Sequence, residues 1–518
     1  MIEEALLAAL QQFFSPEGLG VVIALALSAI LGRLTIFARK DENDISSLPL
    51  VNGKKWWQLT AKEQRKTFCN HAKEILDHAL LNVGDKFRVQ TENGVELLLS
   101  ADYASGMKDD EALDFGKHVE EDMHTSLDGF APFRQGQTRD RIFHDAVKIN
   151  LIQDIARLNT PLSEEASHAL QKHFTNKAEW HEIPLKILAF KIVSQLSSRV
   201  FLGEELCRNA DWLQVTVDYT RDSMQAAQDL RLWPKFLRPL AYWYLPRCRA
   251  IRQELQTSFN IVDPVLQNRR REKEKRVKKG LEPVRHLDAM QWMEDAANGR
   301  PYDATVAQTM MAIAANFSGS DSLSTLMIYL CQDPQLVEDM RKEVITVLSE
   351  NKWSKSTLYK LRLMDSVLKE SQRMKPAAIA VMRRIALKDT KLHDGTKIPK
   401  GTKLMVSTSK SWDSDKYPNP EKFDGYRFLR MREEQGLETA QFVSTTPDAL
   451  GFGMGKHACP GRFFAANELK IALSHILLKY DFKLAPGAPT DPTFQALYWS
   501  ANDNARIVIR RRKEEIEL

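Results

Sequence analysis

The sequence predicts one large, mainly α-helical domain with a small β-rich part, preceded by a transmembrane helix. Apolar residues recur with helical period through long segments, whereas short segments alternate as β-strands do. No Gly/Ser-rich or Pro-rich linker and no internal repeat divides the 518-residue chain after residue 60, which favours a single domain. The helical segments are residues 60–80, 140–175, 185–260 and 303–375, and the β segments lie near residues 86–99 and 385–407.

The N-terminal stretch has the length and charge pattern of a membrane anchor. Residues 18–38 are mainly apolar, and about 20 such residues cross a bilayer if Arg33 reaches back to the interface. Glutamates precede this stretch and basic residues follow it, which predicts a cytosolic C-terminal side. A cleaved signal peptide would have a basic start and a shorter apolar core. We therefore expect an anchor in residues 1–40, a linker in residues 41–50 and the main domain in residues 51–518.

The cysteine content indicates the cellular compartment, and the charge pattern limits the kinds of binding partner. Five cysteines in so long a chain argue against a disulfide framework and for a reducing compartment. Without an Arg-rich mitochondrial presequence, the expected location is the endoplasmic reticulum membrane, with a single span and the main domain in the cytosol. The net charge is +5, and the basic run over residues 268–279 is expected to be a solvated loop. It has no interleaved aromatic residues, so we expect no nucleic-acid binding.

Cys459 lies in the most informative segment of the chain. Residues 452–461 read Phe-Gly-Met-Gly-Lys-His-Ala-Cys-Pro-Gly, and the glycines let the backbone bend tightly and approach a flat ligand. A helical pattern begins directly afterwards, at Arg462. The amides and the dipole at the start of that helix would stabilise negative charge on the sulfur. These features favour a thiolate that binds a metal cofactor.

Other interpretations of Cys459 fit this segment less well. A lone cysteine is usually a small buried hydrophobe. A structural zinc site needs about four ligands, but only His457 lies nearby and no second cysteine does. A nucleophilic cysteine needs a base that is held by a third group. A thiolate on haem iron, by contrast, pushes electron density onto the metal and favours O–O cleavage.

The segment resembles the haem loop of the cytochrome P-450 monooxygenases, Phe-x-x-Gly-x-(Arg/His)-x-Cys-x-Gly, at every fixed position. The resemblance implies that Cys459 is the proximal ligand of the haem iron and that His457 reaches a haem propionate. It also implies that Phe452, Gly455 and Gly461 shape the loop around the cofactor. The implied fold is a large helical haem domain with a small β-rich subdomain.

A second motif is similar to the buried charge triad of the same family. Residues 356–373 carry one apolar stripe and are predicted to form one helix, with Glu370 and Arg373 on one face. Such a pair is ordinarily solvated and stabilises a helix by about 0.2–0.5 kcal/mol. The resemblance supplies a third partner, Arg427, from the family's Phe-x-Pro-x-Arg-Phe segment. Gly425 replaces the usual proline of that segment.

Arg384 is the expected propionate ligand from the β-rich part. Turn signals separate short β-type runs over residues 381–406 and predict a small sheet. In the family, an arginine five residues before an aspartate binds a propionate, which matches Arg384 and Asp389 here. Arg383 is expected to be a solvated neighbour. Residues 377–381 would line the substrate pocket.

Lys148 is a further candidate for propionate binding. The family often uses Trp-x-x-x-Arg on a helix, and the nearest counterpart is His144 with Lys148, four apart in a predicted helix over residues 140–158. Of the two interpretations, we favour that of ordinary polar residues on the protein surface.

Residues 303–332 are predicted to form a helix about 45 Å long, with Asp303 as the N-cap. Family members carry an alcohol on this helix that helps to deliver protons during oxygen activation. Matching by motif makes Asp321 the acid and Ser322 the alcohol. Matching by spacing to the following proline places Ser318 at the alcohol position and Phe317 where an acid commonly sits. We favour the spacing, because a helix fixes the distance to its own end.

The resemblance implies a haem-thiolate monooxygenase that uses dioxygen and electrons from an NADPH-dependent reductase to oxidise a lipophilic small molecule. Residues 197–203 and 287–295 resemble filamentous-fungal members that tailor terpenoids and indole alkaloids. Hydroxylation, epoxidation and multi-step oxidation are equally compatible with the motifs. Two alternatives stay open: a haem-thiolate isomerase or dehydratase that needs no reductase, and a non-catalytic haem-binding membrane protein.

Overall fold

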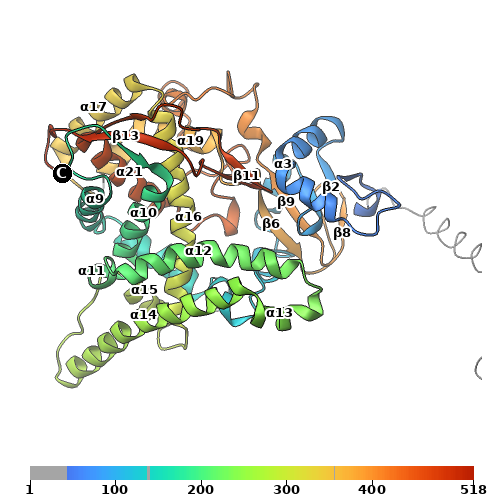
Figure 1. Ribbon diagram of the computed structural model, residues 1–518, viewed down its shortest axis with the longest axis horizontal. Coiled ribbons are helices and arrows are strands. Elements are labelled where there is room, and N and C mark those ends of the chain that lie inside the picture. Colours follow the sequence, from blue (N-terminus) through green and yellow to red (C-terminus); the bar gives the residue numbers. More distant parts are fainter. Residues whose placement is uncertain (1–43, 137–140, 355) are drawn as a thin grey trace, which may run out of the picture.

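Long helices dominate the computed structural model, which describes residues 44–136, 141–354 and 356–518. Figure 1 shows α16 crossing the molecule, α12 and α14 running along one another beside it, and the large sheet with α3 at the end where the described chain begins. The long helices are α3 (Lys62–Asn82), α9 (Asn159–His173), α10 (Leu185–Phe201), α12 (Ala210–Arg231), α14 (Pro246–Lys278), α16 (Ala304–Leu330), α17 (Pro334–Asn351), α19 (Arg362–Met374) and α21 (Arg462–Lys479). The shorter helices are α4 (Ala104–Met107), α5 (Phe115–Asp122), α6 (Ala131–Gln135), α7 (Ile142–Asp145), α8 (Ile152–Asp154), α11 (Gly203–Leu206), α13 (Arg238–Tyr244), α15 (Ala289–Ala297), α18 (Thr357–Lys360) and α20 (Arg427–Glu433).

The strands of the described residues form one larger mixed sheet, in the order β1-β2-β3-β9-β6-β4, and three small sheets. The strands are β1 (Leu50–Val51), β2 (Lys86–Thr91), β3 (Gly94–Leu99), β4 (Leu113–Asp114), β5 (His181–Pro184), β6 (Ala380–Ala386), β7 (Thr390–Lys391), β8 (Lys397–Ile398), β9 (Lys403–Ser407), β10 (Tyr480–Leu484), β11 (Thr493–Gln495), β12 (Tyr498–Ser500) and β13 (Arg506–Arg511). β2 to β3 and β6 to β9 confirm the two β segments predicted from the sequence.

The main hydrophobic core lies between the helices on both sides of α16. Its buried side chains come largely from α9, α10, α16, α17, α19 and α21. α16 begins as predicted, because the Asp303 carboxylate accepts a hydrogen bond from the Val306 N–H at 2.9 Å and so satisfies a free amide of the first turn. The mainly α-helical fold predicted from the sequence is therefore confirmed.

The helix predicted over residues 356–373 is wrong in one respect, because it is broken at Leu361. That residue leaves the helical region with φ −72° and ψ 73°, and α19 starts afresh at Arg362. The cause is Glu343 of α17, whose carboxylate accepts hydrogen bonds from the Leu363 and Met364 N–H groups at 2.6 and 3.0 Å. A carboxylate from another helix thus caps α19.

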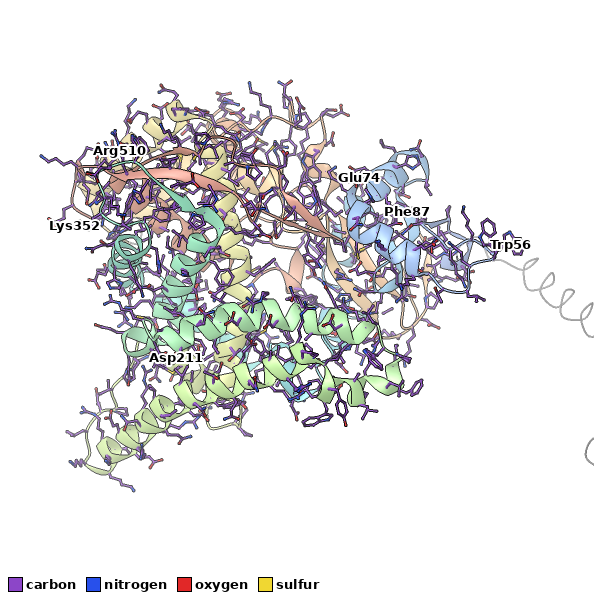
Figure 2. The ribbon with its side chains drawn as sticks, viewed as in Figure 1. Trp56, Glu74, Phe87, Asp211, Lys352 and Arg510 are labelled. Atoms are coloured by element: carbon purple, nitrogen blue, oxygen red, sulfur yellow. The ribbon has the colours of Figure 1, made fainter. Side chains whose placement is uncertain are left out.

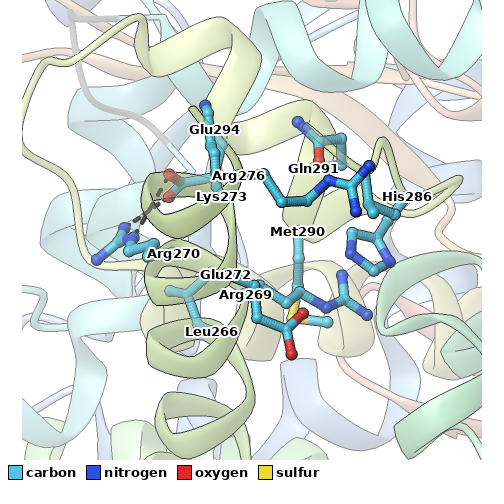
Figure 3. A pocket seen from close by; sticks show the side chains of 11 residues that line it. Leu266, Arg269, Arg270, Glu272, Lys273, Arg276, His286, Met290, Gln291 and Glu294 are labelled. Atoms are coloured by element: carbon cyan, nitrogen blue, oxygen red, sulfur yellow. Dashed lines mark hydrogen bonds and ion pairs between the residues drawn. The ribbon is translucent and has the colours of Figure 1, made fainter. Parts of the chain in front are cut away.

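The basic run over residues 268–279 is not a loop, as the sequence suggested, because all but its last residue belong to α14. Ion pairs between Arg269 and Asp288, at 2.7 Å, and between Arg270 and Glu294, at 2.5 Å, tie this end of α14 to the α15 segment. Figure 3 shows the second pair and the hollow that the two segments enclose. Favourable pairs of this kind let a highly charged segment stay helical.

The predicted membrane anchor, residues 18–38, lies outside the described residues, as does the linker up to residue 43. Each helix that the structure does describe is too short or too polar to cross a bilayer.

Candidate functional site

The loop that carries Cys459 is tightly folded and closely packed. The Cys459 N–H donates to the Phe452 carbonyl at 2.8 Å, which closes the loop on itself. Gly453 and Gly455 have φ values of 68° and 72°, a region that favours glycine. A Cβ atom on Gly455 would lie 2.6 Å from the Lys108 carbonyl oxygen, so only glycine fits there.

Cys459 lies directly before the start of α21, as the sequence predicts. Burial raises the pKa of its thiol, whereas backbone hydrogen bonds from Gly461 and Arg462 and the Arg462 guanidinium lower it. The Arg462 guanidinium also donates to the Cys459 carbonyl at 2.9 Å, which holds the loop against the helix. Burial outweighs these donors, so the pKa of the Cys459 thiol is raised on balance, and a bound metal ion would be what makes the sulfur a thiolate.

Beside this loop, Arg384, which is buried, and His457, which is half-buried, form a basic cluster around Phe115. The Phe115 ring lies 6.1 Å from the His457 ring and 5.6 Å from the central carbon of the Arg384 guanidinium. Burial and the neighbouring cations lower the pKa of His457 to about 4, and burial lowers the pKa of Arg384 to about 10. The negative charge of Asp114 raises the pKa of both groups and so offsets part of these shifts.

This cluster has hydrogen-bonding atoms that the protein leaves unused. Nε2 of His457 and Nε of Arg384 are buried, and neither has a hydrogen-bond partner among the described residues. Buried polar groups are almost always paired, so such atoms indicate a ligand. A carboxylate placed here would accept hydrogen bonds from both groups, and its negative charge would compensate the buried guanidinium of Arg384 and raise the pKa of His457. The cluster therefore fits a haem propionate, and Cys459 beside it fits the iron.

A β-bulge explains how two consecutive arginines are both buried. The pairing of β6 with β9 shifts register between Val381 and Arg384, and Met382 has a φ of 51°. Arg384 reaches the basic cluster, whereas Arg383 forms ion pairs with Glu96 at 3.1 Å and Asp122 at 3.2 Å. The expectation that Arg383 is solvated is wrong, because its side chain is only 12% exposed.

The other predicted propionate-binding pair, His144 and Lys148, does not lie on one regular α-helix. The backbone runs as a π-helix over Ala146–Leu151, so the predicted α-helical spacing between His144 and Lys148 does not hold. Lys148 is exposed. His144 lies near enough to His457 for its charge to contribute to the lowered pKa of that residue.

The predicted charge triad comes together as expected. The Glu370 carboxylate, which is fully buried, accepts two hydrogen bonds from Arg373 at 2.8 Å and hydrogen bonds from the Arg427 Nε at 3.1 and 3.2 Å. Both guanidinium groups also donate to main-chain carbonyls of residues 411–422. At Gly425 a Cβ atom would lie 2.5 Å from a methyl group of Leu336. The triad thus fixes the segment before α20 onto α19.

One stripe of α16 is open although the rest of the helix is buried. Ala314, Phe317 and Ser318 are exposed, and Met310 and Ser322 are half-buried. These positions are three or four residues apart and share one face. The Ser318 hydroxyl donates to the Ala314 carbonyl at 3.1 Å, so its lone pairs can still accept.

Asp321, the acid of the alternative register, is already engaged. One carboxylate oxygen pairs with Lys375, and the other accepts a hydrogen bond from the Ala501 N–H at 2.7 Å. Asp321 and Lys375 are both buried, so their ion pair joins α16 to the end of α19. The carboxylate of Asp321 is thereby committed to a structural role.

Two residues of the site were missed in the sequence. Arg462 could have been found, because it follows the Cys-Pro-Gly string directly. Phe115 could not, because it lies more than 300 residues before Cys459 and no motif marks it.

Comparisons with known proteins agree with this geometry. The family model for cytochrome P-450 matches residues 139–504. Cytochrome P-450 monooxygenase adrA of Penicillium rubens is 42% identical over 505 residues, which are 96% of this chain and 97% of that protein. Cytochrome P-450 monooxygenase 1 of Gibberella fujikuroi is 43% identical over 83% of this chain and 99% of its own length. Among solved structures, retinoic acid-bound cyanobacterial CYP120A1 matches with a TM-score of 0.63 at 17% identity, over 90% of this chain and 99% of that chain.

Proposed function

Because the chain belongs to the cytochrome P-450 family and is a monooxygenase with cysteine-ligated haem, we propose that Cys459 is the iron ligand and that the substrate is a lipophilic small molecule of fungal secondary metabolism. The proposed electron source is an NADPH-dependent reductase. The observation that carries the proposal is the basic cluster, whose buried nitrogen atoms have no hydrogen-bond partner in the described residues, beside a cysteine at a helix start.

Each residue of the site has a proposed task. When bound, the haem supplies the chemistry that activates dioxygen for insertion of one oxygen atom into the substrate. Cys459 would hold the iron, and the Gly461 and Arg462 amides would stabilise the negative charge of its sulfur. His457 and Arg384 would hold a propionate through their unused nitrogen atoms. Lys148 stays a second candidate for such a contact, at the surface.

The open stripe of α16 favours an apolar substrate. Phe317 is 39% exposed, and Ala314 and Met310 continue the same apolar face. Burying this surface against a hydrocarbon skeleton stabilises a complex by about 25 cal/mol per Å². We propose a terpenoid or an indole alkaloid, to which residues 377–381 of the neighbouring segment also contribute contacts.

Reductase-dependent turnover tests the proposal. The full chain, expressed with an NADPH-dependent reductase, should shift its absorption on binding terpenoid or indole test compounds and should oxidise at least one of them only when NADPH is present. Rearrangement of an organic peroxide without the reductase would instead support an isomerase or dehydratase. A haem spectrum that no compound changes would support a non-catalytic haem-binding protein.

Ser318→Ala is expected to uncouple oxygen reduction from product formation. We propose Ser318 as the alcohol that positions a proton-donating water, because it is exposed on the open stripe while Asp321 is paired. General acid–base groups contribute about 10²–10⁴-fold, and we expect a loss of about 10–100-fold in product per NADPH because water can replace part of the hydroxyl. Hydrogen peroxide per product would rise correspondingly. Ser322→Ala is the matched control, and a larger effect there would reverse the assignment.

We also propose that the chain is anchored by residues 1–40 in the endoplasmic reticulum membrane and that a patch of its main domain touches the bilayer. Phe236 is 82% exposed, and Leu232, Trp233, Leu240, Trp243 and Tyr244 are exposed around α13. Exposed Trp56, Trp57 and Leu59 lie where the described chain begins, and Figure 2 shows Trp56 projecting outward there. Amphipathic aromatic side chains favour the membrane interface, and exposed apolar side chains that cluster mark interaction surfaces.

The membrane patch predicts which tryptophans are quenched by lipids. In vesicles whose acyl chains carry bromine, we expect fluorescence quenching of the full chain that is largely lost when Trp56, Trp57, Trp233 and Trp243 are all replaced by phenylalanine. Trp212→Phe, which removes a fully buried indole, is the control and should leave the quenching unchanged. Equal quenching in both variants would show that the patch does not touch the membrane.

A further inference from the structure

The hollow between the end of α14 and residues 284–294 is lined mainly by cations. Arg269, Arg270, Lys273 and Arg276 line it from α14, and His286 lines it from the opposite wall. With its open mouth it holds about 490 Å³ of space, and none of the residues assigned to the haem site lines it. The proposed function therefore leaves this hollow without a role.

The spacing of the α14 cations places them on one wall of the hollow. Arg269 and Arg276 are seven residues apart, which is about two helical turns, so they share one face of the helix. At a rise of about 1.5 Å per residue, the two positions are about 10 Å apart along the axis. Lys273 lies between them on the same face, four residues after Arg269. The wall therefore carries a row of positive charge about two turns long.

Arg269 is only partly neutralised by the carboxylates around it. One terminal nitrogen donates to Asp288 at 2.7 Å, and the other lies 3.9 Å from Glu205. The Nε atom of Arg269 is buried and has no hydrogen-bond partner in the described residues. Buried polar atoms are almost always paired, so an unpaired guanidinium nitrogen in the wall of a hollow indicates that an acceptor binds there.

Arg276 and His286 have further unused donors. The Nε atom of Arg276 donates to the Glu282 carbonyl at 2.7 Å, whereas its two terminal nitrogens have no acceptor within residues 44–136, 141–354 and 356–518. Neither ring nitrogen of His286 is hydrogen-bonded to that part of the chain. Figure 3 shows the His286 ring between the Arg269 and Arg276 guanidinium groups. Donors from both walls therefore point into one space.

The acidic side chains in the wall of the hollow do not neutralise these donors. Glu294 is paired with Arg270 at 2.5 Å. Glu272 is exposed and forms no ion pair with another described residue. The free nitrogens of Arg269 and Arg276 thus have no carboxylate acceptor in the part of the chain that the structure describes.

We propose that this hollow binds a small molecule that carries a diphosphate group or two neighbouring phosphate groups. A guanidinium group binds phosphate through two parallel hydrogen bonds, and an imidazole N–H donates a further one. Two linked phosphates can contact Arg269 and Arg276 together, with His286 donating between them, whereas a single carboxylate is too small to span both. Lys273 adds attraction as a mobile point charge. The inference does not depend on the reaction at the haem.

A soluble metabolite and a membrane lipid can both carry such a group. Figure 1 shows the end of α14 projecting from the side of the molecule opposite to α3 and the start of the described chain. The exposed aromatic residues proposed to touch the bilayer lie at that start and around α13. We therefore expect a soluble ligand, such as a nucleoside diphosphate.

Calorimetric titration of the full chain with inorganic pyrophosphate tests the proposal. The titration is done in a neutral detergent at about 0.15 M salt, which screens attraction by the diffuse charge of the helix. We expect Arg276→Gln to raise the Kd by about 10–100-fold, the usual weight of a hydrogen bond to a charged group. Arg271→Gln is the matched control, because Arg271 is an exposed residue of the same helix that does not line the hollow, and it should leave the Kd unchanged.

His286→Ala checks the opposite wall without altering α14. It should raise the Kd by up to about 10-fold through loss of one hydrogen bond, and it keeps the result interpretable if Arg276→Gln loosens the end of α14. A wild type that releases no heat with pyrophosphate up to about 1 mM would overturn the proposal. Equal effects of Arg276→Gln and Arg271→Gln would also overturn it, because the attraction would then come from general positive charge. Binding of polyglutamate but not of pyrophosphate would assign the hollow to an acidic protein segment instead.

Vesicles separate the two sources of the phosphate groups. The full chain is placed in vesicles of phosphatidylcholine, with or without phosphatidylinositol bisphosphate. Equal pyrophosphate binding in both supports a soluble ligand, whereas weaker binding in the presence of the second lipid assigns the site to a lipid headgroup, and either result supports the site. The titration contains neither NADPH nor an oxidisable substrate, so its failure is distinct from failure of the proposed function.

Discussion

Cys459→Ser is expected to abolish both the thiolate haem spectrum and substrate oxidation. A serine hydroxyl does not ionise near neutral pH, and oxygen is a harder ligand than sulfur. The Gly461 and Arg462 amides that stabilise a sulfur anion would then have no charge to stabilise. Changes to residues outside the ligand set of a metal commonly cost about 10–100-fold, so loss of the ligand should lower turnover by more than about 100-fold.

Reduced protein treated with carbon monoxide gives the decisive measurement. The wild type should show the red-shifted band of thiolate ligation, and Cys459→Ser should lack it. Cys331→Ser is the matched control, because Cys331 is also half-buried but lies at the end of α16 among apolar groups that raise the pKa of its thiol. A variant at 459 that keeps the band would mean that another cysteine holds the iron.

The parts of the site that sequence could predict are those with a local pattern. The Cys459 loop is one continuous string with glycines at fixed places, and Gly455 is required by its contact with Lys108. The Asp303 cap and the start of α21 follow equally local rules. The Glu370 triad includes one residue that is distant in the sequence, Arg427. It could still be predicted, because Arg373 and Arg427 each lie in a recognisable segment.

The parts that sequence could not predict depend on what lies across an interface. Glu468 occupies an ordinary helical position, and nothing in its neighbours along the chain shows that it faces Ser197 and Gly319. Arg383 is buried because a β-bulge turns it towards Glu96 and Asp122.

The breaks and extensions of helices have the same origin. α19 begins late because Glu343, a residue of another helix, caps it. α14 continues through a highly charged run because carboxylates at 288 and 294 neutralise two of its arginines. These contacts form only in the folded chain. A sequence pattern predicts the periodicity of a helix but not the residues of other elements that it contacts.

Glu370→Gln is expected to lower the free energy of unfolding by about 3–5 kcal/mol, the typical cost of breaking a buried ion pair from one side. The carboxylate is fully buried and serves both Arg373 and Arg427. With an amide in its place, two buried guanidinium groups lose their counter-charge, and the amide nitrogen presents a donor to other donors. Native domains are stable by only about 5–15 kcal/mol, so the loss is a large fraction of the total.

Urea unfolding followed by circular dichroism, together with the fraction of protein that retains haem, measures this effect. The triad fixes the segment before α20 and not the iron, so properly folded Glu370→Gln molecules should keep the thiolate spectrum. Glu433→Gln is the matched control, because the carboxylate there pairs with Arg362 at 3.8 Å in an exposed position and exposed pairs contribute about 0–1 kcal/mol. Equal stability of the two variants would show that the buried arginines are satisfied by the main-chain carbonyls of residues 411–422 alone.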